Sequence, residues 1–225
     1  MKRSLLLLVV LCGHFSLFAQ RYDIYTPLEF QQAYKKGTRS TDGKPGPKYW
    51  HNTVDYVISV SVDPKTRGIS GKETVTYKNN SPDALSNIVV RLYYDVFKKG
   101  NERAMQVNPE DISEGVEISE LEVNGNTYDL SKPNQVRRGG TNMIVPLGEP
   151  LKTGESVKLE ITWAQKVPLT VRRTGAKDST SYFIAYWYPQ IAVYDDIFGW
   201  DNLDYTFATE FYNNLGNYDI RITCK

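Results

Sequence analysis

The chain has 225 residues, of which 40% are hydrophobic, 24% charged and 12% aromatic. This composition excludes a disordered chain, a collagen-like chain and a disulfide-rich miniprotein, and it supplies apolar material for one large domain or two small ones. The formal net charge of +1 gives no basic surface of the kind that holds nucleic acid, so no nucleic-acid partner is expected.

Residues 1–19 have the pattern of a secretory signal peptide. Lys2 and Arg3 precede a short apolar run, and the small residue Ala19 stands before Gln20. The pattern predicts cleavage after Ala19 and an exported protein, periplasmic or extracellular. The apolar run is too short to span a bilayer, and no later run of spanning length follows, so no transmembrane segment is expected.

Residues 20–50 are expected to form an N-terminal extension. Thr26 is placed to cap a helix, Pro27 suits its first position, and Glu29 completes a capping box. This helix should run through Tyr34 and end near Gly37, before a loop rich in Gly and Pro.

Residues 51–225 carry the alternation of half-buried strands, interrupted by turn residues. The clearest signals predict a hairpin around a turn at 63–68, a strand at 116–123 with a bulge near Ser119, and a strand at 157–163. Further strands are expected at 88–92, 142–147, 181–189, 205–212 and 218–224. Many short strands without βα alternation predict an all-β fold, an antiparallel β-sandwich with a short N-terminal helix. The last strand reaches Lys225 with no turn after it, so we expect the domain to be incomplete at its C-terminus.

Two stretches are candidates for chemistry. Asp195, Asp196, Asp201 and Asp204 stand close together, which fits a calcium site, a carboxylate pair for glycoside cleavage, or an ordinary loop. The aromatic run 182–188 fits a stacking platform for sugar rings or peptide side chains, or a core strand. His51 and Cys224 are the only histidine and cysteine after residue 19, so a His- or Cys-rich zinc site is not expected.

Three segments, taken in order, resemble a known family. They are GPKYWHN at 46–52 followed by DY at 55–56, the hairpin region 60–83, and the stretch from WYPQIAVYDD at 187–196 through GW at 199–200 to EFYNNLGNYD at 210–219. Residues 45–225 thereby resemble the N-terminal domain of exported bacterial zinc aminopeptidases of peptidase family M1, the gluzincin or aminopeptidase N type.

The resemblance implies a saddle-like β-sandwich that precedes a thermolysin-like catalytic domain and caps its cleft. Family catalysis relies on a G-x-M-E-N motif and on H-E-x-x-H with a later Glu for zinc, and neither motif occurs in this sequence. No catalytic or metal-binding residue is therefore assigned, no cofactor is expected in this chain, and zinc is expected in the catalytic domain that this chain would pack against. The chain alone is expected to be inactive, with peptides as substrates of a full-length relative.

The family also implies substrate-pocket candidates at Tyr186 and Tyr188. Relatives of this type often have Gln, facing the substrate amine, where this chain has Tyr186. An alternative remains open from the residues themselves: a complete secreted β-sandwich module that binds carbohydrate or protein. A small glycosidase that uses the Asp cluster is a third possibility.

Overall fold

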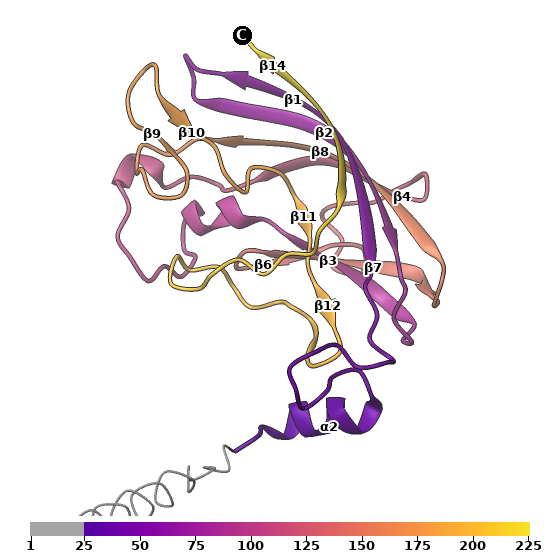
Figure 1. Ribbon diagram of the computed structural model, residues 1–225. Coiled ribbons are helices and arrows are strands. Elements are labelled where there is room, and N and C mark those ends of the chain that lie inside the picture. The colour runs from indigo at the N-terminus through magenta and orange to yellow at the C-terminus, as the bar shows by residue number, and fades with distance from the viewer. Residues whose placement is uncertain (1–24) are drawn as a thin grey trace, which may run out of the picture.

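The structure, a computed structural model, describes residues 25–225 and is built mainly of β-strands (Figure 1). The predicted signal peptide lies outside the described residues. The helical elements are α2 (Leu28–Lys36) and two 3₁₀ turns, η1 (Tyr93–Phe97) and η2 (Pro109–Asp111). The strands are β1 (Thr53–Asp63), β2 (Gly68–Lys78), β3 (Leu85–Arg91), β4 (Glu117–Val123), β5 (Asn126–Thr127), β6 (Arg137–Gly139), β7 (Asn142–Leu151), β8 (Ser156–Lys166), β9 (Gly175–Ala176), β10 (Tyr182–Phe183), β11 (Gln190–Ile191), β12 (Tyr194–Asp195), β13 (Gly199–Trp200) and β14 (Asn217–Cys224).

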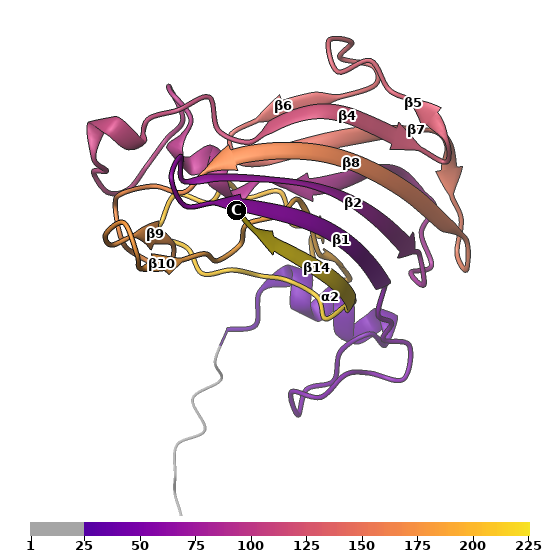
Figure 2. The ribbon, with the colours of Figure 1, turned by 90° about the horizontal axis from the view of Figure 1, so that it is seen from above.

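Two sheets form the body of the molecule. The larger has the strand order β14-β1-β2-β8-β4-β5, and its strands lie side by side in a curved layer (Figure 2). The smaller has the order β11-β3-β7-β6. Side chains from both sheets meet in one hydrophobic core. The all-β class and the sandwich architecture are thus confirmed, although β1 and β14 pair in parallel rather than antiparallel.

Period-2 alternation explains the central strands of the larger sheet. Along β8, every second residue from Val157 to Trp163 is buried, while the residues between them are more exposed. β1 and β2 form the predicted hairpin, paired from Thr53 with Lys78 to Asp63 with Gly68. The bulge in β4 is also confirmed, because the register against β8 shifts between Ile118 and Glu120.

A carboxyl group interrupts the apolar inner face of the larger sheet. Glu73 on β2 points to the same side as Val75 and lies opposite Ile58 of β1 and Ile161 of β8. The side chain is fully buried, and neither carboxyl oxygen has a hydrogen-bond partner among residues 25–225. Burial raises the pKa of Glu73 well above its ordinary value, because the apolar surroundings disfavour the charged carboxylate relative to the neutral acid.

The N-terminal extension contains the predicted helix. α2 ends where Gly37 adopts a left-handed conformation, with φ 77°, and donates its N–H to Tyr34 O, as expected of a C-terminal glycine. The predicted cap is wrong: Pro27 occupies the N-cap, and no side chain among residues 25–225 caps the helix. Thr26 instead offers its carbonyl to the side-chain amide of Gln31.

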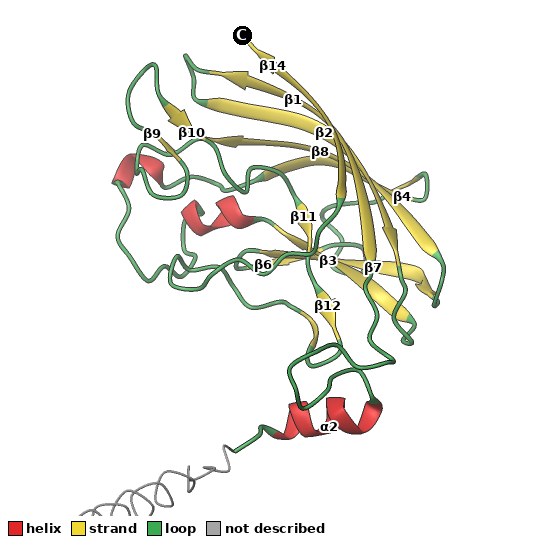
Figure 3. Ribbon diagram, viewed as in Figure 1, coloured by secondary structure: helices red, strands yellow, loops and turns green. Residues whose placement is uncertain are grey.

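The strands predicted at 181–189 and 205–212 are wrong over most of their length. Only Tyr182–Phe183 and the pair after Pro189 are in strands, and 201–216 is irregular (Figure 3). Aromatic side chains satisfied the strand pattern, but in these segments the rings pack on one another, which needs no ladder of backbone hydrogen bonds. Tyr186 and Phe207, with φ of 41° and 74°, also break extended geometry.

β14 continues the inner face of the larger sheet without a covering layer. Tyr218, Ile220 and Ile222 pair with Tyr56, Ile58 and Val60 of β1, yet they are 47%, 41% and 65% exposed.

Within residues 25–225, no helix is both long enough and apolar enough to cross a membrane.

Candidate functional site

The Tyr and Asp candidates all lie in the segment between β10 and β14. Tyr186 has a left-handed backbone, an uncommon conformation for a residue with a side chain. Its hydroxyl is buried without a partner among residues 25–225, and burial raises its pKa. Its ring contacts those of Tyr93, Tyr94, Tyr205 and Phe211. This packing accounts for an aromatic ring at position 186, but it accounts neither for the left-handed backbone nor for the buried, unpaired hydroxyl.

Tyr188 belongs to a different aromatic cluster. Its ring lies edge-on to Tyr56, Trp187 and Tyr218, and its hydroxyl donates to the Tyr218 hydroxyl at 3.1 Å. Burial, followed by that contact, raises the pKa of Tyr188. Tyr186 and Tyr188 share no aromatic neighbour, so the structure does not bring the two candidates into a single pocket.

The four aspartates serve different parts of the fold. Asp196 accepts hydrogen bonds from both Nε and Nη2 of Arg39, at 3.0 and 2.6 Å. Burial acts to raise the pKa of Asp196, but the contacts with Arg39 and Thr38 together lower it. Asp204 accepts from the backbone N–H of Thr141 at 2.8 Å and the side-chain amide of Asn142 at 2.9 Å. These contacts agree with the interpretation of a structural loop.

The remaining two aspartates face a common cavity. Asp195 caps the turn after β12 by accepting from the N–H groups of Ile197 and Phe198. Asp201 follows β13, held by its own N–H bond to Val193 O. No cluster of three or more metal-binding side chains occurs in the part of the chain that the structure describes.

A cavity of about 560 Å³ lies between β12, β13 and the segment 201–212. Its polar lining includes Arg91, Asp195, Asp201 and Glu210, and its apolar lining includes Phe198, Trp200, Leu203 and Tyr212. Burial and the nearby Asp195 carboxylate raise the pKa of Tyr212 to about 12, so its hydroxyl stays protonated and donates to Asp195 at 3.2 Å.

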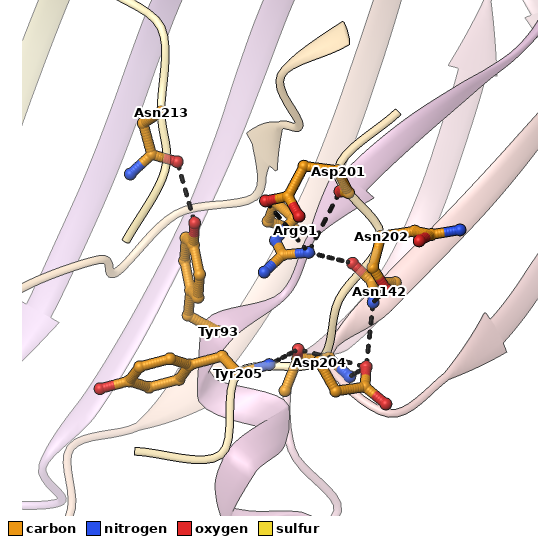
Figure 4. A network of polar contacts seen from close by, with 9 residues as sticks. Arg91, Tyr93, Asn142, Asp201, Asn202, Asp204, Tyr205 and Asn213 are labelled. Atoms are coloured by element: carbon orange, nitrogen blue, oxygen red, sulfur yellow. Dashed lines mark hydrogen bonds and ion pairs between the residues drawn. The ribbon is translucent and has the colours of Figure 1, made fainter. Parts of the chain in front are cut away.

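Arg91, the last residue of β3, lines this cavity. It takes part in the network of polar contacts that Figure 4 shows. The residue is only 5% exposed. Its Nη1 donates to the Asn142 side chain at 2.9 Å and to the Asp201 carbonyl at 3.2 Å, while the Asp201 carboxylate lies 3.8 Å away. Its Nε is buried without a partner among residues 25–225. The Arg91 guanidinium is therefore less completely paired than a buried cation usually is.

A larger hollow of about 800 Å³ lies between the β4–β5 turn and the β7–β8 turn. Its charged lining consists of Glu149 and Glu155, and the latter is used by the turn itself, where it accepts from the Lys152 N–H. We therefore take the Arg91 cavity as the candidate site.

Sequence reasoning missed Arg91 and Glu73. Glu73 could have been found, because the period-2 alternation of the predicted hairpin places it in phase with Val75 and Tyr77, which are buried. Arg91 gave no such signal, because the alternation of Ile88, Val90 and Leu92 places Arg91 on the opposite face, whereas the structure buries Val89 and Arg91 as well.

Comparison with known proteins gives similarity to solved structures only. The chain is similar to the M1 zinc metallopeptidase of Deinococcus radiodurans at 21% identity and a TM-score of 0.36, over 55% of this chain and 22% of that one. Legionella pneumophila aminopeptidase A matches at 13% identity and a TM-score of 0.33, over 52% and 11%. Yeast LTA4 hydrolase matches at 15% identity and a TM-score of 0.32, over 63% and 19%.

In each case the match spans less than a quarter of the other chain. No protein-family model matches the chain, and no curated protein matches it in sequence.

Proposed function

We propose that this chain is the exported N-terminal substrate-capping domain of a zinc metallo-aminopeptidase. The zinc-binding and catalytic groups would come from residues outside this chain, because the sequence contains neither H-E-x-x-H nor G-x-M-E-N. In such an enzyme this domain would cover the cleft and help to select peptides with a free N-terminus.

One observation carries this proposal. The three sequence segments that resemble the family lie far apart in the chain but meet in the fold. β14 pairs with β1, so that Tyr218 stacks on Tyr56 at a ring-centroid distance of 5.0 Å. Trp50 stacks on Tyr194 at 5.7 Å. If these segments belong to one domain of the kind found in the family, they should lie together in the fold, and these contacts meet that requirement.

Tyr186 supplies a second line of support. It occupies the position at which the resemblance places a substrate contact, and it combines positive φ with an unpaired hydroxyl. Strain of this kind is concentrated at functional positions in proteins.

The decisive experiment is a sequencing read of the locus beyond the codon for Lys225. A reading frame that continues, or resumes after one shift, into both peptidase motifs supports the proposal. A stop with neither motif nearby overturns it. An aminoacyl-anilide assay of the purified chain is the biochemical counterpart: we expect no turnover, and zinc-dependent turnover abolished by a chelator would contradict the assignment.

A second candidate function is a free-standing secreted binding module. The Arg91 cavity favours it, because convergent polar groups beside aromatic side chains are a common composition for ligand sites. A stop codon at the end of this chain, together with cooperative thermal unfolding of the monomer, would move this candidate to first place.

A further inference from the structure

Among the carboxylates that line the Arg91 cavity, one differs from the others because its oxygen atoms are still free to accept hydrogen bonds. Asp195 already receives two backbone N–H groups and the Tyr212 hydroxyl. Glu210 is paired with Arg173 at 2.6 Å. The Asp201 carboxylate, in contrast, accepts no hydrogen bond from residues 25–225, and its ion pair in that part of the chain is with Arg91 Nη1 at 3.8 Å. Its side chain is 16% exposed, so solvent only partly satisfies it.

The charges that line the cavity are mainly negative. Three carboxylates, Asp195, Asp201 and Glu210, face it, against the single guanidinium of Arg91. Adding Arg173, which pairs with Glu210 from outside the lining, still leaves a negative balance. This balance favours a ligand that carries a positive charge and donates hydrogen bonds.

The rim of the cavity is apolar and exposed. Phe198, Leu203 and Tyr212 are 73%, 71% and 46% exposed, and all three line the same cavity. Single exposed apolar side chains are common on protein surfaces. Three such side chains around one charged cavity, however, form a surface that a ligand can contact. Aromatic rings beside carboxylates also attract organic cations.

Arg91 adds a requirement for an acceptor. The guanidinium is nine-tenths buried beside the cavity that it lines, and its Nε has no partner among the described residues. A ligand that presents a carbonyl oxygen to Arg91, a cationic donor to Asp201 and an apolar neighbour to the rim would complement all three parts. A peptide that contains Arg or Lys next to an apolar residue has these groups in one short stretch.

We propose that the Arg91 cavity binds a basic residue, together with its apolar neighbour, from the interior of a peptide chain. The Asp201 carboxylate receives the guanidinium or ammonium group, and Phe198, Leu203 and Tyr212 cover the apolar side chain. This site stands on the cavity alone and does not depend on a catalytic domain or on recognition of a free N-terminus.

The test titrates the whole chain with blocked dipeptides while the indole N–H of Trp200, which lines the cavity, is followed by NMR. The probe is N-acetyl-Arg-Phe-amide, and the matched probes are N-acetyl-Gln-Phe-amide and N-acetyl-Arg-Gly-amide. Both ends are blocked, so that failure of the aminopeptidase proposal leaves this result unaffected. We expect the Arg-Phe probe to shift the Trp200 signal, and each matched probe to bind at least about tenfold more weakly.

Variants separate the two halves of the cavity. Asp201→Asn keeps the shape of the side chain and removes its charge. It should weaken binding of the Arg-Phe probe at least about tenfold and leave binding of the Gln-Phe probe nearly unchanged. Asp178→Asn, an exposed aspartate outside the cavity, is the control and should bind like the unaltered chain. If Asp201→Asn does not fold, Leu203→Ser is the alternative variant, because it changes only an exposed side chain. It should weaken binding of the Arg-Phe probe more than binding of the Arg-Gly probe.

Three results would overturn the proposal: equal binding of the Arg-Phe and Gln-Phe probes, binding that leaves Trp200 unshifted, or no binding of any dipeptide. Cellotetraose serves as a fourth probe. A Trp200 shift with this sugar and none with the peptides would assign the cavity to carbohydrate instead.

Discussion

Replacement of Glu73 by Gln should stabilise the protein, and increasingly so as the pH rises. Glu73 is fully buried between Ile58 and Ile161, and no hydrogen-bond donor from residues 25–225 reaches its carboxyl oxygens. Burial therefore raises the pKa of the folded state well above that of the unfolded chain, which is about 4.3. The folded protein holds a proton that the unfolded chain releases.

The sign and size of the effect follow from proton linkage. The contribution of a raised pKa to stability is fully present below the unfolded value and is lost as the pH rises through the folded value. In the interval between the two, each pH unit removes up to about 1.4 kcal/mol from the free energy of unfolding. Between pH 5 and pH 7 the unaltered chain should lose up to about 2.7 kcal/mol through this one group, whereas Glu73→Gln has no proton to release.

Urea unfolding, followed by circular dichroism at pH 5, 6, 7 and 8, measures this difference. Glu160→Gln is the matched control, because Glu160 lies beside Lys72 and Lys158 on the other face of the larger sheet and its change should stay within about 0.5 kcal/mol. Glu73→Leu also removes the unpaired polar atoms and should exceed Glu73→Gln by roughly 1–3 kcal/mol. Parallel pH profiles for Glu73→Gln and the unaltered chain would refute the reasoning, as would a stability gap that closes with rising pH.

Two further predictions concern packing and charge pairing. Gly71→Ala would place a methyl group 2.8 Å from the Trp163 ring, so it should destabilise the chain by roughly 1–3 kcal/mol in urea unfolding, while Gly148→Ala, with open space around it, should change little. Asp95→Asn would leave Arg138 without the carboxylate that it now contacts at 2.6 Å, with an expected loss of about 2 kcal/mol in thermal or urea unfolding. Stability equal to that of the unaltered chain in either variant would contradict the contact described.

The parts of the fold that were predictable are those in which one face of a strand is buried. The hairpin, β8 and the β4 bulge follow from alternation, because a half-buried strand imposes period 2 on its sequence. The segments 181–189 and 205–212 were mistaken for strands, because the packing of aromatic rings on one another favours the same residue types as a strand does. Such packing does not require backbone hydrogen bonds to a neighbouring strand. The cavity was not predictable at all: it brings Arg91 together with Asp201, 110 residues further along the chain, and no local pattern encodes that approach.

The pairing of β1 with β14 also has a consequence for how the chain is made. Asn217 donates to Asp55 across a separation of 162 residues, so β1 leaves the ribosome long before its neighbour exists. At ordinary elongation rates that interval lasts on the order of ten seconds to half a minute. The hairpin β1–β2 can form at once, but one edge of β1 stays open to other chains throughout synthesis. Sheet completion is therefore a late and non-local event, and nascent chains of this protein should depend on chaperones until β14 has been added.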